Sequence, residues 1–374
     1  MAVQRGLGTR WTVGLIAAAV FLVWVVPPAG AATGNSPTRR ALRGEWVTVS
    51  PSLGLRSHRV REYVTAEESR VVRAIEVMVR RLPRTLADGR TLTDGAQWFV
   101  EPAAESSPVL GLQRRVLDEM AAIVGASGGM APGWQQVFVA ARTQAYIRQA
   151  LDQAGCDPDL VRSGGVVLMG ASVCDRRVVI TNITGYAHLT HAGQRITAEL
   201  ESRHERPIRE VPHRLVVRAA GGLAHELVHS WRASPLSGQV RADEPAWFAE
   251  GLAEFWAGIA VARALGPRHT YLTQHVLRSR DFADWARQCP LPLERYRVPT
   301  QFGAGCEYHV GLLAVERLHA VRPDLLGSAG ALGKAASHAT FAGWFRETYG
   351  ISLDRFERET DAYIAAIRRA EARG

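Results

Sequence analysis

The chain has 374 residues, 47% of them hydrophobic, which is enough to bury one large hydrophobic core or two of moderate size. Its formal net charge is +9, and its basic residues are arginines apart from Lys334. Because these arginines are scattered, with no dense basic run and no interleaved aromatic residues, the sequence argues against a nucleic-acid-binding protein.

Residues 1–32 have the pattern of a secretory signal peptide. Arg5 and Arg10 precede an uncharged apolar stretch, 11–26, and the small residues AGAA (29–32) follow. The apolar stretch is short for a membrane span. We therefore expect cleavage at its end and a secreted protein with no stable membrane insertion, with an uncleaved N-terminal anchor as the alternative.

Residues 33–130 are predicted to form an N-terminal region of mixed structure that could have a regulatory or inhibitory role. Thr65 and Glu68 have the spacing of a capping box, and the flexible stretch ASGGMAPG near residue 130 favours a domain boundary. The predicted elements are a short strand within 45–50, a helix from Thr65 to about Leu82, a strand at 97–100 and a helix over 108–124.

Residues 131–374 are predicted to form a second domain, of the α+β class. Residues 131–262 are expected to hold a small mixed sheet and the helices around residues 225 and 250, and 263–374 an α-helical subdomain. The predicted strands are 136–139, 165–169 and 177–183, and the predicted helices are 142–153, 212–231, 256–265, 307–320, a segment after Pro323, 340–349 and 353–369.

The four cysteines are expected to form disulfides, because their even number fits an oxidising compartment. They are Cys156, Cys174, Cys289 and Cys306, and three pairings are possible. We favour Cys156–Cys174 and Cys289–Cys306, since each pair closes a short local loop; four buried free thiols are the alternative.

The stretch His225-Glu226-Leu-Val-His229 is an HExxH pattern. On a helix, residues four apart lie on one face, so both imidazoles can reach one metal ion. Glu226 projects about 100° round the same helix, where it can act as a general base toward an attacking water. Two imidazoles and an oxygen ligand suit Zn²⁺.

The third ligand is predicted in the next helix. Asp243-Glu244-Pro245 indicates a helix start, with an acidic cap and a proline at the first helical position. Glu250 and Glu254 follow on one helical face. We assign Glu250 as the third ligand and Glu254 as the carboxylate that accepts the second N–H of a ligating histidine.

The motifs HELVHSW and PAWFAEGLAEF resemble those of the gluzincin metallopeptidases, in which HExxH is followed by W-x-x-E-G-x-A. The resemblance implies that His225, His229 and Glu250 bind one catalytic Zn²⁺ and that Glu226 is the catalytic base. It is strong over about 40 residues and extends weakly over 131–370, where the chain resembles peptidase-MA-like secreted proteins.

Further roles follow from this resemblance. In gluzincins a tyrosine or histidine opposite the zinc stabilises the oxyanion, and Tyr308 or His309 could supply it; a core aromatic is the alternative for Tyr308. In zincins an edge strand beside the active-site helix binds the peptide substrate, and residues 178–183 could be this strand or an ordinary core strand.

The sequence thus predicts a secreted zinc metallopeptidase with a zincin-like fold and a peptide or protein substrate. Two alternatives remain: a catalytically inactive zincin-like binding protein, and a zinc amidase that acts on peptidoglycan. The spacing from His229 to Glu250 is longer than in the aminopeptidase branch, which leaves the substrate open. No oligomeric state is predicted.

Overall fold

The structure is a computed structural model. The predicted signal peptide and the predicted helix after Pro323 lie outside the residues that it describes. Within these residues, no helix is long and apolar enough to cross a lipid bilayer. The described residues are 46–47, 58–59, 65–82, 96–105, 108–126, 135–141, 143–158, 169–174, 177–182, 221–229, 232, 243–266, 270–272, 274–275, 289–290, 292–298, 305–322 and 338–372.

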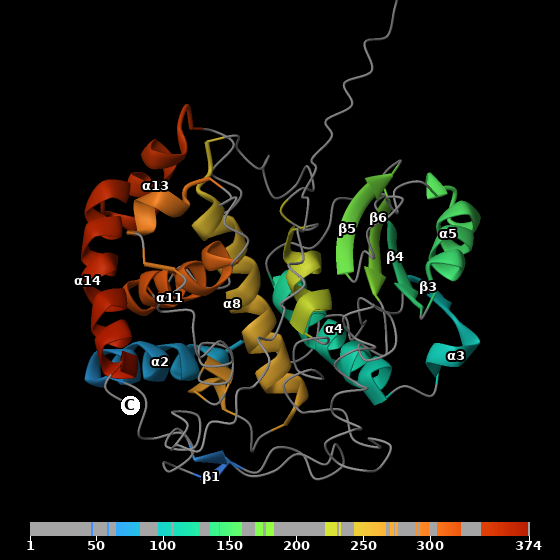
Figure 1. Ribbon diagram of the computed structural model, residues 1–374, viewed down its shortest axis with the longest axis horizontal. Helices are drawn as coiled ribbons and strands as arrows, with labels where there is room; N and C mark the ends of the chain where they lie inside the picture. The colour runs from blue at the N-terminus through green and yellow to red at the C-terminus, as the bar shows by residue number, and fades with distance from the viewer. Residues whose placement is uncertain are drawn as a thin grey trace, which may run out of the picture.

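The molecule is mostly helical and carries one small mixed sheet, so the α+β class is confirmed at this coarse level (Figure 1). The four-stranded sheet has the order β3-β4-β6-β5, with β5 antiparallel to β6 and the other neighbours parallel. Its strands are β3 (Gln97–Val100), β4 (Gln135–Ala140), β5 (Met169–Cys174) and β6 (Arg177–Asn182). Trp46–Val47 (β1) and His58–Arg59 (β2) form a separate antiparallel pair.

The sheet corrects one role predicted for residues 178–183. Residues 178–182 belong to β6, which pairs with β4 on one side and β5 on the other, so they form part of a central strand and not the substrate-binding edge. Within the described sheet, the edge strands are β3 and β5. In the view of Figure 1, β5 is the strand nearest to the 221–229 helix.

Strand β5 extends beyond the strand predicted from the apolar run at 165–169. Of that run the structure describes Met169, and β5 continues from there to Cys174 through Gly170 and Ala171, which have low intrinsic strand preference. Its pairing with β6 runs from Met169 opposite Asn182 to Cys174 opposite Arg177. Tertiary pairing with a β-branched neighbour, and not local propensity, therefore defines this strand.

Strand β4 connects the sheet to the two hydrophobic clusters of the molecule. Val137 and Val139 pack in a cluster with Ile147 of helix α5 (Gln144–Gln153), whereas Phe138, on the opposite face, packs in the main helical core. A strand buried on both faces is typical of parallel pairing. The sheet is thus fixed between α5 and the helical part of the molecule.

The helical part is organised around α8 (Ala246–Ala264), which is buried on nearly all sides. A helix of this kind must have neighbours all round, and it shares one hydrophobic core with the helices that surround it. The other helices are α2 (Ala66–Val79), α3 (Pro102–Glu105), α4 (Pro108–Ala126), α11 (Cys306–Val321), α13 (Phe341–Tyr349), α14 (Leu353–Ala372) and the 3₁₀ turn η4 (Leu293–Tyr296).

The predicted start of α2 is confirmed. The Thr65 hydroxyl accepts a hydrogen bond from the Glu68 N–H, and the Glu68 carboxylate accepts one from the Thr65 N–H. Val72 and Ile75 of α2 lie in the same hydrophobic core as α8, as does Leu117 of α4. Helices of residues 65–126 therefore share a core with the helices of the metal-binding motifs, and the domain boundary near residue 130 stays a prediction.

Helices α8 and α11 cross in contact at two glycines. A Cβ added to Gly251 would lie 2.3 Å from the backbone carbon of Gly311, and one added to Gly311 would lie 2.2 Å from the carbonyl oxygen of Trp247. Only residues without a side chain allow this approach. The crossing brings the first turn of α11 beside the part of α8 that carries Glu250.

The disulfide Cys289–Cys306 is confirmed, with its Cα atoms 5.5 Å apart. It fixes residue 289 to the first residue of α11. Cys156 is also disulfide-bonded, and the described residues include no free cysteine. The side chain of Cys174, its expected partner, lies outside the described side chains.

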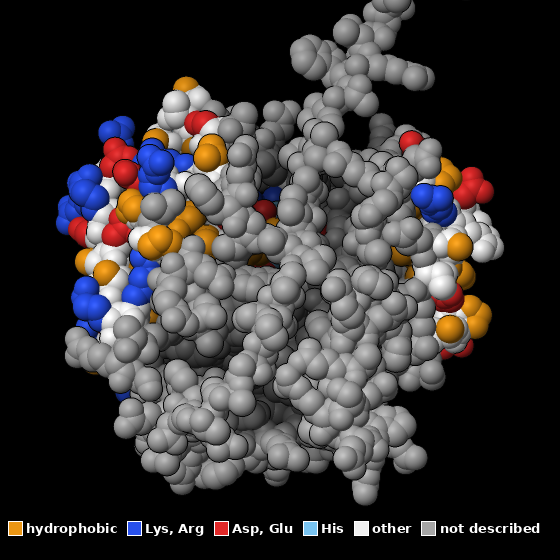
Figure 2. Space-filling model, in the orientation of Figure 1, with side chains coloured by type: hydrophobic (Ala, Val, Ile, Leu, Met, Phe, Trp, Pro, Cys, Tyr) orange, Lys and Arg blue, Asp and Glu red, His pale blue; other side chains and the backbone are white. Residues whose placement is uncertain are grey.

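The face of the molecule in Figure 2 shows basic and acidic side chains interspersed over α13 and α14. The contacts are of the same mixed kind: Arg355 pairs with Glu359 one helical turn away, and Arg297 pairs with Asp354. Such exposed pairs contribute little to stability, typically below about 1 kcal/mol each.

Candidate metal centre

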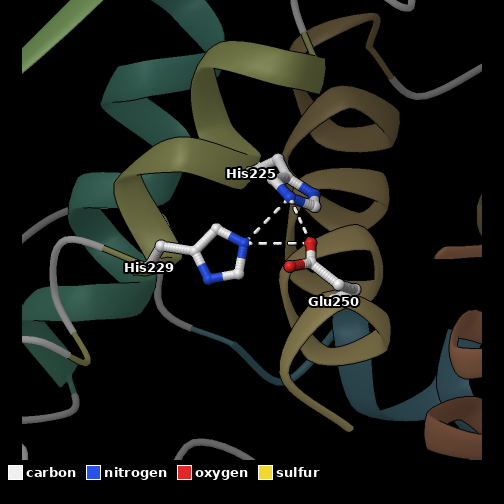
Figure 3. A group of neighbouring side chains, drawn as sticks. All are labelled: His225, His229 and Glu250. Atoms are coloured by element: carbon white, nitrogen blue, oxygen red, sulfur yellow. Dashed lines mark hydrogen bonds and ion pairs between the residues drawn. The ribbon is translucent and has the colours of Figure 1, made fainter. Parts of the chain in front are cut away.

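Two neighbouring helices supply the candidate metal ligands. The first comprises helical residues 221–229, whose side chains Leu223 and Leu227 are buried in the main core. This burial turns His225 and His229, one turn apart, toward α8. Glu250 comes from the second turn of α8 and points back at them (Figure 3).

Three ligand atoms of these side chains converge on one point. His225 Nε2 and His229 Nε2 lie 3.0 Å apart, and they lie 3.0 and 3.1 Å from Glu250 Oε2. Among the described residues, these three form the group that could hold a metal ion. Ligands about 2.0–2.2 Å from a tetrahedral ion lie about 3.3 Å from one another, so this triangle is close to the required size.

Glu254 makes the predicted contact with the first histidine. Its Oε1 lies 2.9 Å from Nδ1 of His225, on the opposite side of the ring from Glu250. A carboxylate at Nδ1 favours the tautomer with the proton on that nitrogen, which leaves the lone pair on Nε2. Lone pairs of His225 and Glu250 then face the same point, an arrangement that a cation would stabilise.

The electrostatics of Glu250 fit a ligand role. Burial alone would raise its pKa, but the positive charge that His229 and His225 carry when protonated, and the hydrogen bonds that they then donate, outweigh this effect and lower the pKa below its ordinary value. A cation bound at the same point would take the place of these protons. The carboxylate is therefore ionised. The site also remains reachable, because the side chains of His229 and Glu250 are 24% and 22% exposed.

Glu226 lies next to His225 and is largely buried, at 8% exposure. Its carboxylate is close enough to Tyr308 to raise the pKa of that phenol through its charge. Glu226 and Tyr308 therefore lie near each other beside the ligand cluster.

Tyr308 lies in the first turn of α11. Its ring stacks on the ring of His225, with centroids 5.4 Å apart and an interplanar angle of 19°. Burial, followed by the charges of Glu250 and Glu226, raises the pKa of its hydroxyl, so the group is protonated. Tyr308 is thus a neutral donor beside two ligands.

The start of α8 differs from the prediction. Pro245 is the N-cap and no side chain caps the helix, so the predicted acidic cap is wrong. The two acidic residues before it contact other helices instead: Asp243 accepts a hydrogen bond from the Phe341 N–H at 2.7 Å, and Glu244 forms an ion pair with Arg232.

A second cluster of histidine and carboxylates was not predicted. His275 Nε2 lies 3.0 Å from Glu68 Oε1, and its Nδ1 lies 2.8 Å from Glu316 Oε2, while the Tyr271 hydroxyl donates to Glu316 at 2.7 Å. The side chains of His275, Glu68 and Glu316 are fully buried. No local pattern indicates this cluster, because its members lie far apart in the sequence.

Arg232 was also missed as a site residue. Its one sequence signal is its place three residues after His229, on the polar face of the same predicted helix.

Comparisons of the chain with models of protein families, with curated proteins and with solved structures give no match. The resemblance to gluzincins therefore stays a prediction from the two sequence motifs.

Proposed function

We propose that this chain is a secreted, zinc-dependent metallopeptidase with a zincin-like arrangement of sheet and metal-binding helices. One observation carries the proposal: His225 Nε2, His229 Nε2 and Glu250 Oε2 lie within 3.1 Å of one another, with Glu226 adjacent on the same helix. Two imidazoles and one carboxylate are the ligand set of catalytic zinc sites that keep a position open for water or substrate.

The ligand set suits zinc on chemical grounds. Two nitrogen donors and one carboxylate oxygen favour zinc over calcium or magnesium, which prefer all-oxygen sites. When bound, zinc would act as a Lewis acid toward the scissile carbonyl and lower the pKa of water. His225 would be held in its ligating tautomer by Glu254.

Glu226 would move the protons of the reaction. Its carboxylate would accept a proton from the attacking water and then donate it to the leaving amine nitrogen. Its low exposure limits competition from bulk water. Tyr308, protonated and adjacent to two ligand residues, would donate a hydrogen bond to the oxygen that becomes negative as the carbonyl is attacked.

Strand β5 offers a way to bind an extended substrate. It is an antiparallel edge strand of the described sheet, and in Figure 1 it lies on the side of the sheet that faces the 221–229 helix. A peptide added along this edge would pair backbone to backbone. This strand takes the substrate-binding role that the sequence had suggested for 178–183.

The proposal can be tested with the mature chain and its Glu226→Gln variant. Metal content is measured by elemental analysis, and both proteins digest a peptide library. We expect one zinc per chain in both proteins and a loss of turnover of about 10²–10⁴-fold in the variant, since it keeps the ligands and lacks the base. Glu359→Gln, the same change at an exposed helical pair with Arg355, is the control and should cleave normally.

The outcomes separate the alternatives. Undiminished cleavage by Glu226→Gln would contradict the proposed base. Zinc in the protein without cleavage of any peptide would favour a binding protein on the same framework. Release of peptide from purified cell wall, with no cleavage of the library, would favour the peptidoglycan amidase.

A further inference from the structure

Arg232 links the two helices that carry the candidate metal ligands. It lies three residues after His229, and its guanidinium forms an ion pair with Glu244, the residue before Pro245. The guanidinium carbon also lies 5.7 Å from the ring centroid of Phe248. Arg232 therefore contacts Glu244, just before the N-cap of α8, and Phe248, in the first turn of α8.

The pair is buried, with side-chain exposures of 6% for Arg232 and 5% for Glu244. Removing two charges from water costs about as much as their attraction returns, so a buried ion pair is a weak source of stability. Its geometric effect is stronger, because a planar guanidinium binds a carboxylate and stacks on an aromatic ring in defined directions. The arrangement of Arg232 is thus better suited to fixing position than to adding stability.

The residues that Arg232 would hold in place are close in the sequence to the candidate metal ligands His229 and Glu250. Arg232 follows His229 by three residues in the sequence, and Glu250, in the second turn of α8, follows Glu244 by six. No side chain caps the start of α8, so the contacts made by residues 243 and 244 hold this end of the helix from outside. A metal site requires its ligands to be placed within about 0.5 Å.

We propose that Arg232 is a positioning residue for the metal centre: by holding Glu244 and Phe248 it sets the spacing between the helix of His229 and the helix of Glu250. This inference rests on the proposed metal site. It implies that the buried pair determines metal affinity more than it determines the stability of the metal-free fold.

The test compares full-length wild type with the double variant Arg232→Met/Glu244→Met, which replaces the pair by apolar side chains of similar length. Zinc affinity is measured by competition with a chromophoric chelator, and the unfolding midpoint of the metal-free protein by calorimetry. We expect an unfolding midpoint close to or above that of wild type, since no charge is left unpaired. We expect zinc affinity to fall by about 10–100-fold, as for other residues that orient ligands.

Arg232→Lys provides a second test with a milder change. It keeps the charge but lacks the planar fork and the stack on Phe248, so zinc affinity should fall while the unfolding midpoint of the metal-free protein stays near that of wild type. Wild-type zinc affinity in the folded variants would overturn the inference and leave the proposed function intact. A wild-type protein that does not bind zinc would overturn both.

Discussion

Among the described residues, two clusters of histidine and carboxylate differ in how the histidine nitrogens meet the carboxylate oxygens. At the candidate metal centre, Nε2 of His225 and Nε2 of His229 approach the same oxygen of Glu250. In the second cluster, each nitrogen of His275 has a carboxylate of its own. In the first cluster, two histidine nitrogens and one carboxylate oxygen meet at a single point. In the second cluster, each histidine nitrogen has its own carboxylate as partner.

This difference determines the protonation of the second cluster. Burial alone would lower the pKa of His275, but the charges of and hydrogen bonds to Glu316 and Glu68 outweigh it and raise the pKa to about 9. His275 is therefore a cation between two carboxylates at neutral pH. An imidazole that holds protons on both nitrogens has no lone pair for a metal.

Accessibility differs in the same way. The side chains of His275, Glu68 and Glu316 have no exposed surface, whereas those of His229 and Glu250 are 24% and 22% exposed. Proximity of histidine and glutamate thus does not by itself indicate a metal site. The two clusters are separated by whether several lone pairs meet at one point that solvent can reach; the first cluster meets this criterion and the second does not.

Replacing one histidine in each cluster by alanine should give the largest effects. One replacement should remove zinc binding, and the other should reduce the stability of the fold. His225→Ala should abolish stoichiometric zinc binding and cleavage while the metal-free protein unfolds at nearly the wild-type temperature. His275→Ala should bind zinc but lose about 3–5 kcal/mol of stability, because two buried carboxylates lose their partner. Zinc content and denaturant unfolding measure the two effects. Loss of zinc in His275→Ala at a temperature where it is folded would contradict the separation.

The pH dependence of stability should report the second cluster. His275, faced by Glu68, Glu316 and Tyr271, has a folded pKa above its unfolded value of about 6.5, so its stabilisation is complete below pH 6.5 and is lost as the pH rises toward 9. The free energy of unfolding should fall by about 3 kcal/mol more over this interval in wild type than in His275→Gln. Urea unfolding at several pH values measures this; parallel curves for the two proteins would contradict the protonated state.

The glycine crossing of α8 and α11 is predicted to support the first cluster. Gly251→Ala places a methyl group against the Gly311 backbone and should cost about 1–3 kcal/mol of stability, and it should weaken zinc binding because Glu250 is the adjacent residue. Gly111→Ala in α4 is the matched control. It meets nothing within 4 Å and should gain up to about 1 kcal/mol from helix propensity. Equal effects of the two substitutions would exclude a special role for the crossing.

The contact of Glu254 with His225 should affect metal binding alone. Glu254→Gln should lower zinc affinity by about 10–100-fold and leave the fold intact, since a neutral amide holds the ligating tautomer less firmly. Chelator competition measures the change. Unaltered zinc affinity would mean that Glu254 has no effect on metal binding by His225.

The sequence predicted the elements whose signals are local. The capping box of Thr65 and Glu68 depends on a spacing of three residues, and the histidines depend on a spacing of four. Glu250 could be chosen because the motif around it lies on one helical face. Helix α2 likewise follows from apolar periodicity, whereas the start of α8, which is buried on nearly all sides, was located by its motif.

The sequence did not predict features that depend on distant partners. Strand β5 is defined by pairing with β6, and His275 contacts Glu68 across 207 positions of sequence. Glu244 was predicted to cap α8 because it directly precedes Pro245. In the structure its carboxylate instead forms a buried ion pair with Arg232. In each case tertiary contacts outweighed local preference.

The most direct test of the account is a crystal structure of the zinc-loaded protein with anomalous data collected at the zinc absorption edge. We predict one anomalous peak about 2.0–2.2 Å from Nε2 of His225, Nε2 of His229 and a carboxylate oxygen of Glu250, with a further position open to solvent. A zinc ion bound elsewhere, or a Glu250 side chain turned away from the two imidazoles, would contradict the account.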